Sequence, residues 1–398
     1  MPGGVVKQRV DVIPSGAVDH NHAPDRQAAE SVETSQAGRV RLPSISPDFV
    51  RDKGRGPYYN LAVKIDLGEE AVLRITCLYV GRVGDVIMAT PFLRALRRRF
   101  PKARIRLLVG WRSVQVLPLI PFIDEWAVLE KPFRLDGHLK LAYSLLREPC
   151  DLLVDLNSSF SKTSAIVAKA VRARRSVAFD KGKGPQVFDL ALPAPAEKEH
   201  MLERYQRLAE AFKAPYDPEL ELRLPPADLA EAESLLAPLV LKGDRSFKIL
   251  IHPGNFDRFS FRWPEEKFVS LTDRLLDDPT LRIYYVSGPG EEEKVLDIVR
   301  ALKRPVPVLP PARLGVAGAM LKKMDLFVCN ITGTTHLAVA LKVPTFGFYA
   351  GYTQAVWRPR GARHGGTLCP DWESCRETSV DEAQSALKDH IGRLSPWL

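Results

Sequence analysis

Apolar residues from about Leu73 onward form short runs that alternate with stretches of helical periodicity. Residues 73–80, LRITCLYV, are rich in apolar and β-branched side chains and predict a buried strand. Residues 90–100, TPFLRALRRRF, begin with the threonine and proline of a helix start, and their apolar residues fall on one face. The same alternation continues to about residue 351. It predicts an α/β fold in which helices flank parallel sheets.

The alternation begins late and is interrupted once, which divides the chain into three parts. Residues 1–68 are polar, rich in proline, glycine and charge, and lack periodicity, so we expect a flexible extension. Residues 217–244 are rich in proline and charge around one predicted helix, after which the strand and helix signals restart. We therefore predict two doubly wound, Rossmann-like domains, residues 69–235 and 236–398, that face a central cleft. Ligands of such sheets bind outside the carboxyl ends of the strands.

Basic residues are concentrated in the first predicted domain. The chain has a net charge of +9, and residues 73–200 alone hold 22 Lys and Arg against 12 Asp and Glu. Ordinary solvated helix faces would explain this excess, and so would a partner that carries phosphates or carboxylates. The chain has no zinc-finger spacing and no RNA-binding aromatic motif. An acidic small molecule or glycolipid is therefore favoured over nucleic acid as the partner.

Signals for membrane insertion, secretion and metal binding are weak. No apolar run has membrane-spanning length, and the N-terminus lacks the apolar core of a secretory signal, so we expect a cytoplasmic protein. The five cysteines include no C-x-x-C pair, which argues against a disulfide framework and against a zinc site. We expect no metal in the functional site.

Two glycines and one acid follow the first predicted strand, in VGRVGD at residues 80–85. The glycines allow a tight turn, and Asp85 then stands at the carboxyl end of the strand, where a substrate would bind. A carboxylate at this point can cap the next helix or act as a general base. From the residues alone the capping role is favoured.

Three motifs of the second predicted domain could bind a nucleotide sugar. In CNITGTTHLAVAL, residues 329–341, a Thr/Gly turn between strand and helix suits a pyrophosphate, although threonine capping also explains it. The histidine of this motif, His336, is more simply a packed residue. IHPGNFDRFSFRWP, residues 251–264, offers a glycine at a strand end and two arginines that could pair with phosphates. SGPGEEE, residues 287–293, places acids where they could bind sugar hydroxyl groups or stabilise a helix N-terminus.

Four motifs, taken in order, resemble those of the glycosyltransferase family 9 heptosyltransferases: GDVIMATPFLRALRRRFP, HPG followed by RWPEEKF, SGPGEEE, and N-x-TG-x-x-HLAVAL-x-VPTFGFYAG. The resemblance extends from about Leu73 to the C-terminus. It implies a two-domain GT-B fold, with the acceptor bound by the first domain and the nucleotide sugar by the second. Enzymes of this family transfer heptose from ADP-heptose to the inner core of lipopolysaccharide. The resemblance therefore implies a similar donor, an acidic glycan or glycolipid acceptor, and a peripheral contact with the inner membrane surface.

The resemblance also implies roles for individual residues. Asp85 would be the general base that takes a proton from the acceptor hydroxyl, with Gly84 and Arg82 beside the acceptor. The arginines of the following helix would attract an acidic acceptor. No metal or cofactor is implied beyond the ADP-linked sugar, which is a co-substrate. The donor site would comprise Gly254, Asn255, Arg258, Arg262, Gly288, Glu291, Thr332, Gly333, Thr334, Thr335 and His336.

Two positions depart from the family pattern. Ile331 stands where the family usually has an acid that meets the hydroxyl groups of the sugar, and Phe261 stands where it usually has a lysine. Arg258 or Arg262 could supply the charge that is lost at residue 261. Two alternatives stay open: a catalytically weak protein that binds sugar nucleotides, and a nucleotide-sugar epimerase on the same fold.

Overall fold

The structure is a computed structural model, and it describes residues 72–129, 148–182, 188–240, 243–256 and 261–394. All of these residues belong to one compact unit, Asn60–Leu398. The predicted extension, residues 1–68, lies outside the described residues, and so does Arg258.

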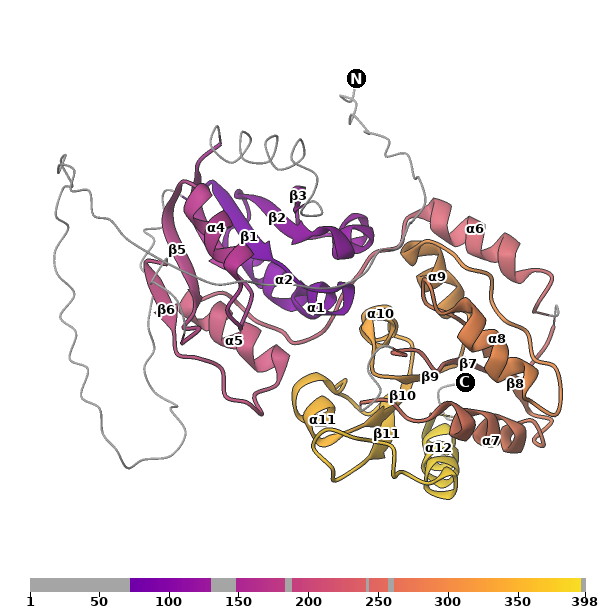
Figure 1. Ribbon diagram of the computed structural model, residues 1–398. Coiled ribbons are helices and arrows are strands. Elements are labelled where there is room, and N and C mark those ends of the chain that lie inside the picture. The colour runs from indigo at the N-terminus through magenta and orange to yellow at the C-terminus, as the bar shows by residue number, and fades with distance from the viewer. Residues whose placement is uncertain (1–71, 130–147, 183–187, 241–242, 257–260, 395–398) are drawn as a thin grey trace, which may run out of the picture. The chain divides into compact units, whose positions relative to one another are not determined.

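The first sheet contains six parallel strands in the order β3-β2-β1-β4-β5-β6 (Figure 1). β1 lies between β2 and β4, where Ile75 is opposite Ile105 on one side and Leu152 on the other. Both faces of a parallel sheet are covered, which explains the nearly continuous apolar run of β1. The strands are β1 Arg74–Tyr79, β2 Arg104–Gly110, β3 Glu125–Leu129, β4 Cys150–Asp155, β5 Ala173–Phe179 and β6 Leu190–Leu192.

Two helices that follow β1 meet at a break that the sequence explains. Pro91, near the start of α2, has no N–H to donate to Ile87 of α1, and the Thr90 hydroxyl donates to the Ile87 carbonyl instead, at 2.7 Å. The predicted helix start at Thr90 is confirmed, but the pattern does not predict the short α1 before it. The helices of this half are α1 Val83–Met88, α2 Thr90–Arg99, the 3-10 helix η1 Trp111–Leu119, α4 Lys162–Ala170 and α5 Met201–Ala211.

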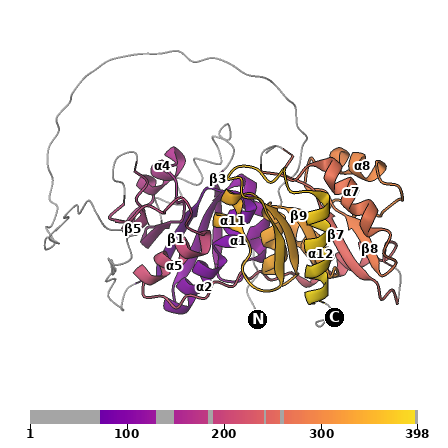
Figure 2. The same cartoon turned by 90° about the horizontal axis from the view of Figure 1, so that it is seen from below.

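The second sheet contains five parallel strands in the order β11-β10-β9-β7-β8. Its core includes the fully buried Trp263, whose ring stacks on Phe348 of β10 with the centroids 4.1 Å apart. Helices α7 and α12 pack against each other beside this sheet (Figure 2). Its strands are β7 Phe247–His252, β8 Leu281–Tyr285, β9 Leu326–Asn330, β10 Thr345–Tyr349 and β11 His364–Leu368. The predicted α/β class is confirmed.

The helices of the second half begin with α6, which lies in the proline-rich passage where one helix is predicted. The domain boundary placed at residues 235 and 236 stays a prediction. The helices are α6 Pro226–Leu236, α7 Glu265–Leu275, α8 Glu292–Arg300, α9 Leu314–Leu321, α10 Gly333–Ala340, α11 Gly351–Trp357 and α12 Val380–Leu394.

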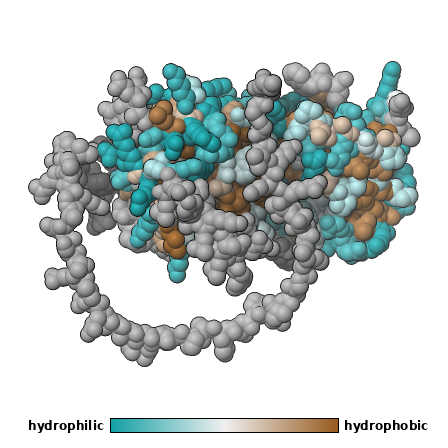
Figure 3. All heavy atoms as spheres, turned by 90° about the horizontal axis from the view of Figure 1, so that it is seen from above, coloured by the Kyte–Doolittle hydropathy of each residue, from teal (hydrophilic) through white to brown (hydrophobic). Residues whose placement is uncertain are grey.

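The described surface mixes hydrophilic and hydrophobic residues, and hydrophilic residues surround smaller hydrophobic areas on the face in Figure 3. Exposed large apolar side chains include Trp126 of β3 and Ile166 of α4. Within the described residues, no helix is both long enough and apolar enough to cross a membrane.

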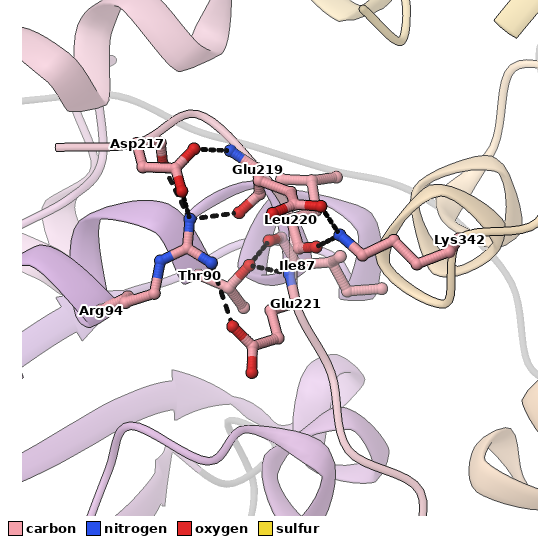
Figure 4. Close-up of polar contacts among 8 residues, drawn as sticks. All are labelled: Ile87, Thr90, Arg94, Asp217, Glu219, Leu220, Glu221 and Lys342. Atoms are coloured by element: carbon pink, nitrogen blue, oxygen red, sulfur yellow. Dashed lines mark hydrogen bonds and ion pairs between the residues drawn. The ribbon is translucent and has the colours of Figure 1, made fainter. Parts of the chain in front are cut away.

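The segment that follows α5, residues 217–221, is held by a buried arginine of the first half (Figure 4). Arg94 of α2 is only 6% exposed. Its guanidinium donates to the carbonyl oxygens of Asp217 and Glu219 at 2.9 and 2.8 Å and pairs with the carboxylate of Glu221 at 3.0 Å. These charge-assisted hydrogen bonds fix the segment against α2.

The second half holds the same segment through Lys342, which follows α10 (Figure 4). Its ammonium group donates to the Leu220 carbonyl at 2.9 Å and pairs with the carboxylate of Glu219. Arg97 of α2 also has an internal partner, the carboxylate just before β3. Arg94 and Arg97 are therefore engaged within the chain, and the expectation that the arginines of α2 attract an acidic acceptor stays a prediction.

Replacing Arg94 by methionine should lower the free energy of unfolding by roughly 2 kcal/mol, because the carbonyl groups of Asp217 and Glu219 and the carboxylate of Glu221 lose a charged donor. The carboxylates of Asp217 and Glu221 are half exposed, so water replaces part of the interaction. Urea unfolding measures the change. Arg98→Met, at an exposed position of the same helix, is the control and should shift the free energy by less than about 0.5 kcal/mol. Equal losses in both variants would contradict the role given to Arg94.

Candidate active site

Each sheet has one point where its strand order reverses, and three of the four predicted motifs follow the strands at that point; the motif of residues 287–293 follows β8, beside β7. In the first sheet the reversal lies between β1 and β4, and residues 80–85 follow β1. In the second sheet it lies between β7 and β9, which are followed by residues 253–255 and 331–332. Open α/β sheets bind ligands in the crevice outside the carboxyl ends of the strands at this switch point. The motifs therefore lie where the topology predicts a ligand site.

Helices α1 and α10 are in contact near their first residues. A Cβ atom added to Gly84 would lie 2.8 Å from the Cα atom of Gly333 and 3.1 Å from the ring of His336. Any larger residue at position 84 would therefore force the two helices apart. The contact brings the loop after β1 close to the turn after β9. Asp85 is the residue that follows Gly84 and therefore lies next to this contact.

Asp85 is half-buried and lies in the first turn of α1. Its Oδ2 accepts a hydrogen bond at 2.9 Å from the N–H of Arg82, the exposed residue just before the helix. The capping role that the sequence favours is thus present in the geometry. A capping carboxylate can still take a proton from a bound hydroxyl group, and the role of general base stays a prediction.

Two buried tyrosines are affected by the charge of Asp85. Burial raises the pKa of the Tyr79 phenol well above its ordinary value, and the neighbouring Tyr205 and Asp85 raise it further. Burial likewise raises the pKa of Tyr205, with Asp85 as the next cause. Both phenols therefore keep their protons at neutral pH, and neither competes with Asp85 as a base.

Asn330, the last residue of β9, is completely buried and holds the loop after β7. Its Oδ1 accepts a hydrogen bond from the N–H of Trp263 at 2.8 Å. Its Nδ2 donates to the carbonyl oxygens of Pro253 at 2.7 Å and Trp263 at 3.2 Å. One amide therefore fixes both ends of the loop that contains Gly254. Asn330 belongs to the motif of residues 329–341, but that pattern predicts no role for its side chain; a polar residue at the end of a buried strand is the available signal.

Glu291 connects the loops after β7 and β8. Its Oε2 is 2.9 Å from Nε2 of His252 and accepts the N–H of Gly288 at 3.0 Å, and its Oε1 accepts the N–H of Asn255 at 3.1 Å. Asn255 has a φ of 69°, in the left-handed region that asparagine tolerates better than most residues. Glu291 is thus a brace between the two loops, and its predicted contact with sugar hydroxyl groups stays a prediction. His252 belongs to the motif of residues 251–264, whose pattern predicts no role for it.

Three threonines surround the start of α10. Thr335 is completely buried, and its Oγ1 accepts the N–H of Thr332 at 3.1 Å, so it caps the helix. Thr332 and Thr334 are half-buried, and their hydroxyl oxygens are 2.6 Å apart. Thr334 also lies 3.0 Å from Nδ1 of His252. Two of the three predicted hydroxyl groups are therefore accessible to a ligand at this turn.

Two other predicted donor residues are enclosed by the protein. Arg262 is 8% exposed, pairs with the carboxylate of Glu265 at 2.5 Å and lies over the Phe256 ring. His336 is 3% exposed, and burial followed by the nearby His200 lowers its pKa to about 3. It is therefore neutral at physiological pH, and its ring packs 6.0 Å from that of Trp357. In this structure neither side chain is presented to a ligand.

Polar residues after β4 complete the switch point of the first sheet. Oδ1 of Asn157 accepts the N–H of Val80 at 3.1 Å, which ties the loop after β4 to the loop after β1. Asp155 is completely buried, accepts hydrogen bonds from Asn157, and pairs with Lys181. None of these residues is a predicted site residue. The signal for them is the D-x-N sequence at the end of a buried strand.

A family model described as glycosyltransferase family 9 (heptosyltransferase) matches residues 138–385. The lipopolysaccharide core heptosyltransferase OpsX of Haemophilus influenzae is 22% identical over 288 residues, which are 71% of this chain and 80% of that protein. Lipopolysaccharide heptosyltransferase 3 of Escherichia coli is 22% identical over 292 residues, which are 69% of this chain and 82% of that protein.

Solved structures of glycosyltransferases share the fold. The crystal structure of a family 9 glycosyl transferase from Veillonella parvula has a TM-score of 0.71 at 18% identity and covers 82% of this chain and 100% of that one. The structure of the E. coli ADP-heptose LPS heptosyltransferase II has a TM-score of 0.67 at 19% identity and covers 81% of this chain and 100% of that one. The predicted α/β fold of the GT-B type is confirmed.

Proposed function

Because the chain belongs to glycosyltransferase family 9, we propose that this glycosyltransferase moves heptose from ADP-heptose to a lipopolysaccharide-core or other acidic glycan acceptor. The names of its relatives support the donor and the acceptor: they include lipopolysaccharide heptosyltransferases, and the E. coli heptosyltransferase WaaC has been solved with ADP at a TM-score of 0.62. We also propose that the reaction takes place in the cytoplasm, with the protein in peripheral contact with the inner membrane surface.

The observation that carries the proposal is the contact between Gly84 and Gly333. It joins the loop that contains Asp85 to the turn that contains Thr332 and Thr334. A glycosyl transfer needs a base near the acceptor hydroxyl and a group that holds the leaving diphosphate, a few ångströms from one anomeric carbon. We propose that the two switch points supply these groups: Asp85 is the base, and the turn before α10 holds the diphosphate.

We propose a direct displacement with inversion at the anomeric carbon. The Asp85 carboxylate takes the proton of the acceptor hydroxyl, whose oxygen forms the new bond to the anomeric carbon as the bond to the ADP oxygen breaks. The leaving ADP gains negative charge, which the backbone N–H groups at the start of α10 can stabilise. The nucleotide sugar is the co-substrate, and the proposed steps use no further cofactor.

A donor screen tests the proposed function. The protein is mixed with ADP-heptose and with other ADP-, GDP-, UDP- and CDP-sugars, and its unfolding temperature is measured. A donor at ~100 times its dissociation constant should stabilise the fold by about 2.7 kcal/mol. We expect the largest shift with ADP-heptose, together with release of ADP when a lipopolysaccharide-core acceptor is added. A larger shift with a sugar on another nucleotide would contradict the proposed donor.

A sugar-nucleotide-binding protein with little activity is the second candidate. It is favoured by Phe261, which packs against Tyr352 with the ring centroids 5.7 Å apart and offers no charge to a diphosphate. This candidate predicts donor binding without ADP release in the presence of any acceptor. The same screen therefore separates the two.

A further inference from the structure

An open pocket of about 350 Å³ lies between the start of α5 and the segment that follows α11. It is lined by His200, just before α5, and by residues 354, 355, 358–361 and 364 of the second half. A volume of this size is within the range of small-molecule sites, about 300–1,000 Å³. None of the lining residues belongs to the turns at the two switch points. The pocket is therefore a separate candidate site, to which both halves contribute.

Two contacts between the halves hold the walls of this pocket. Nε2 of His200 is 2.9 Å from the carbonyl oxygen of Arg358. The guanidinium of Arg360 pairs with the carboxylate of Glu203, on α5, at 2.5 Å. Both contacts fix the segment after α11 against the start of α5. The shape of the pocket is therefore set by the fold.

The positive charge of the pocket comes from its arginines. Residues 351–370 contain three arginines and no Asp or Glu. Burial, followed by the nearby Arg360, lowers the pKa of His200 to about 4, so this histidine is neutral at physiological pH. Glu203 offsets the charge of Arg360. Arg358 is then the lining cation whose charge is not offset.

Arg358 is half-buried and has no counter-ion. Its guanidinium carbon lies 5.6 Å from the centroid of the buried Tyr349 ring, and its side chain has no hydrogen bond or ion pair with any residue that the structure describes. Burial raises the pKa of the Tyr349 phenol, so this ring supplies no negative charge. A cation–π contact occupies one face of a guanidinium and leaves the N–H groups at its edge available. Arg358 can therefore pair with a phosphate or a carboxylate.

The walls of the pocket continue to the candidate active site. Trp357, the last residue of α11, packs its ring 6.0 Å from the ring of His336. The same His336 ring would lie 3.1 Å from a Cβ atom at Gly84. On the other wall, α5 carries Tyr205, whose phenol is affected by the charge of Asp85. The pocket therefore flanks the loop that contains Asp85.

We propose that this pocket binds an acidic sugar of the glycan acceptor and that Arg358 pairs with the carboxylate or phosphate of that sugar. The inference rests on the proposed function, and it extends the acceptor site from the first half to the second. The pocket is larger than an isolated anion needs, and Ala355 and Pro359 offer apolar surface to the C–H groups of a sugar ring. Arg358 is thus a specificity-determining residue for acidic acceptors.

Calorimetry with a soluble probe tests the pocket in the absence of any donor. The probe is a lipopolysaccharide-core oligosaccharide without acyl chains, in its acidic form and in a neutral form whose carboxylates are reduced to alcohols and whose phosphates are removed. Arg358→Met should bind the acidic form roughly tenfold more weakly than the wild type, because a charge-assisted hydrogen bond is lost. Wild type and variant should bind the neutral form equally, because it offers no anion to Arg358.

Arg363→Met is the matched control, since Arg363 is exposed in the same segment but does not line the pocket. At the same ionic strength it should bind both forms like the wild type. Arg358→Lys keeps the charge without the planar fork and should have an intermediate affinity. In transfer assays Arg358→Met should raise KM for the acidic acceptor roughly tenfold and leave kcat and the affinity for ADP-heptose within about twofold of the wild type.

The outcomes separate this inference from the proposed function. If Arg358→Met weakens the acidic and neutral forms equally, or weakens neither, Arg358 pairs with no anion of the acceptor, and the inference is overturned even where the wild type transfers heptose. If millimolar inorganic phosphate stabilises the wild type but not Arg358→Met, and acceptor binding is unchanged, the pocket binds a free anion and the acceptor assignment is wrong. If the wild type transfers no heptose but Arg358→Met has lost affinity for the acidic form alone, the proposed donor fails and the acceptor pocket stands.

Discussion

Replacing Asp85 by asparagine is expected to lower the rate of sugar transfer by roughly two to four orders of magnitude, the usual contribution of a general base. The affinity for the nucleotide sugar should stay close to that of the wild type, because the donor is proposed to bind at the second switch point. Asparagine keeps an acceptor oxygen for the Arg82 N–H, so the cap of α1 is retained and only the basicity is lost. The turnover number with a lipopolysaccharide-core acceptor and the unfolding temperature are the two measurements.

Asp151 provides a matched control for this variant. Its carboxylate also accepts backbone N–H groups in the first half, from Leu73 at 2.8 Å and Arg74 at 2.9 Å, but these lie at the opposite end of β1 from Asp85. Asp151→Asn should therefore leave turnover unchanged. If Asp85→Asn also leaves it unchanged, Asp85 is a helix cap only, and the base must be sought elsewhere at the switch point.

The strands and most helices were predictable because burial leaves a local pattern in the sequence. The sequences of β1 and β9 are short apolar runs, because both faces of a parallel sheet are covered. The short α1 has no such pattern. It is stabilised by its contact with α10 through Gly84 and Gly333, which are distant in sequence. A helix that depends on tertiary packing cannot be recognised from its own few residues.

The candidate site was predictable to the same extent. Glycine and threonine turns at strand ends are local signals, and they mark the loops that the sheets bring to their switch points. The roles of Asn330 and His252 depend on partners elsewhere in the chain: Asn330 holds Pro253, 77 residues before it, and His252 meets Thr334, 82 residues after it. No local pattern reveals such pairs. Arg262 is different, because its partner Glu265 is three residues later and could have been recognised as a helix-start ion pair.

The basic charge of the first half shows why counting charges alone misleads. The excess of Lys and Arg in residues 73–200 suggests an open attractive surface. In the structure Arg94 is buried, and Arg106 pairs with both Glu125 and Glu148. Part of the excess therefore holds the fold together, and only the exposed remainder, such as Arg82, is available to the acidic acceptor that we propose.

Replacing Asn330 should lower the free energy of unfolding more than replacing any other residue of the site. Asn330→Leu fills nearly the same volume but leaves the N–H of Trp263 and the carbonyl oxygen of Pro253 buried without their partner. Two such groups should lower the free energy of unfolding by about 3 kcal/mol. Because the amide fixes both ends of the loop that contains Gly254, the affinity for the nucleotide sugar should fall as well. Urea unfolding and calorimetry measure the two effects.

Gln354→Leu in α11 is the control for the loss of an amide. Its side chain is half-buried and makes no hydrogen bond with any of the described residues, so its removal should change the free energy of unfolding by less than about 0.5 kcal/mol. A small effect of Asn330→Leu would mean that the loop after β7 is held chiefly by Trp263, whose indole N–H donates to the Thr378 carbonyl at 2.8 Å. In that case the stacked ring, rather than the buried amide, would be the element that keeps the second switch point in place.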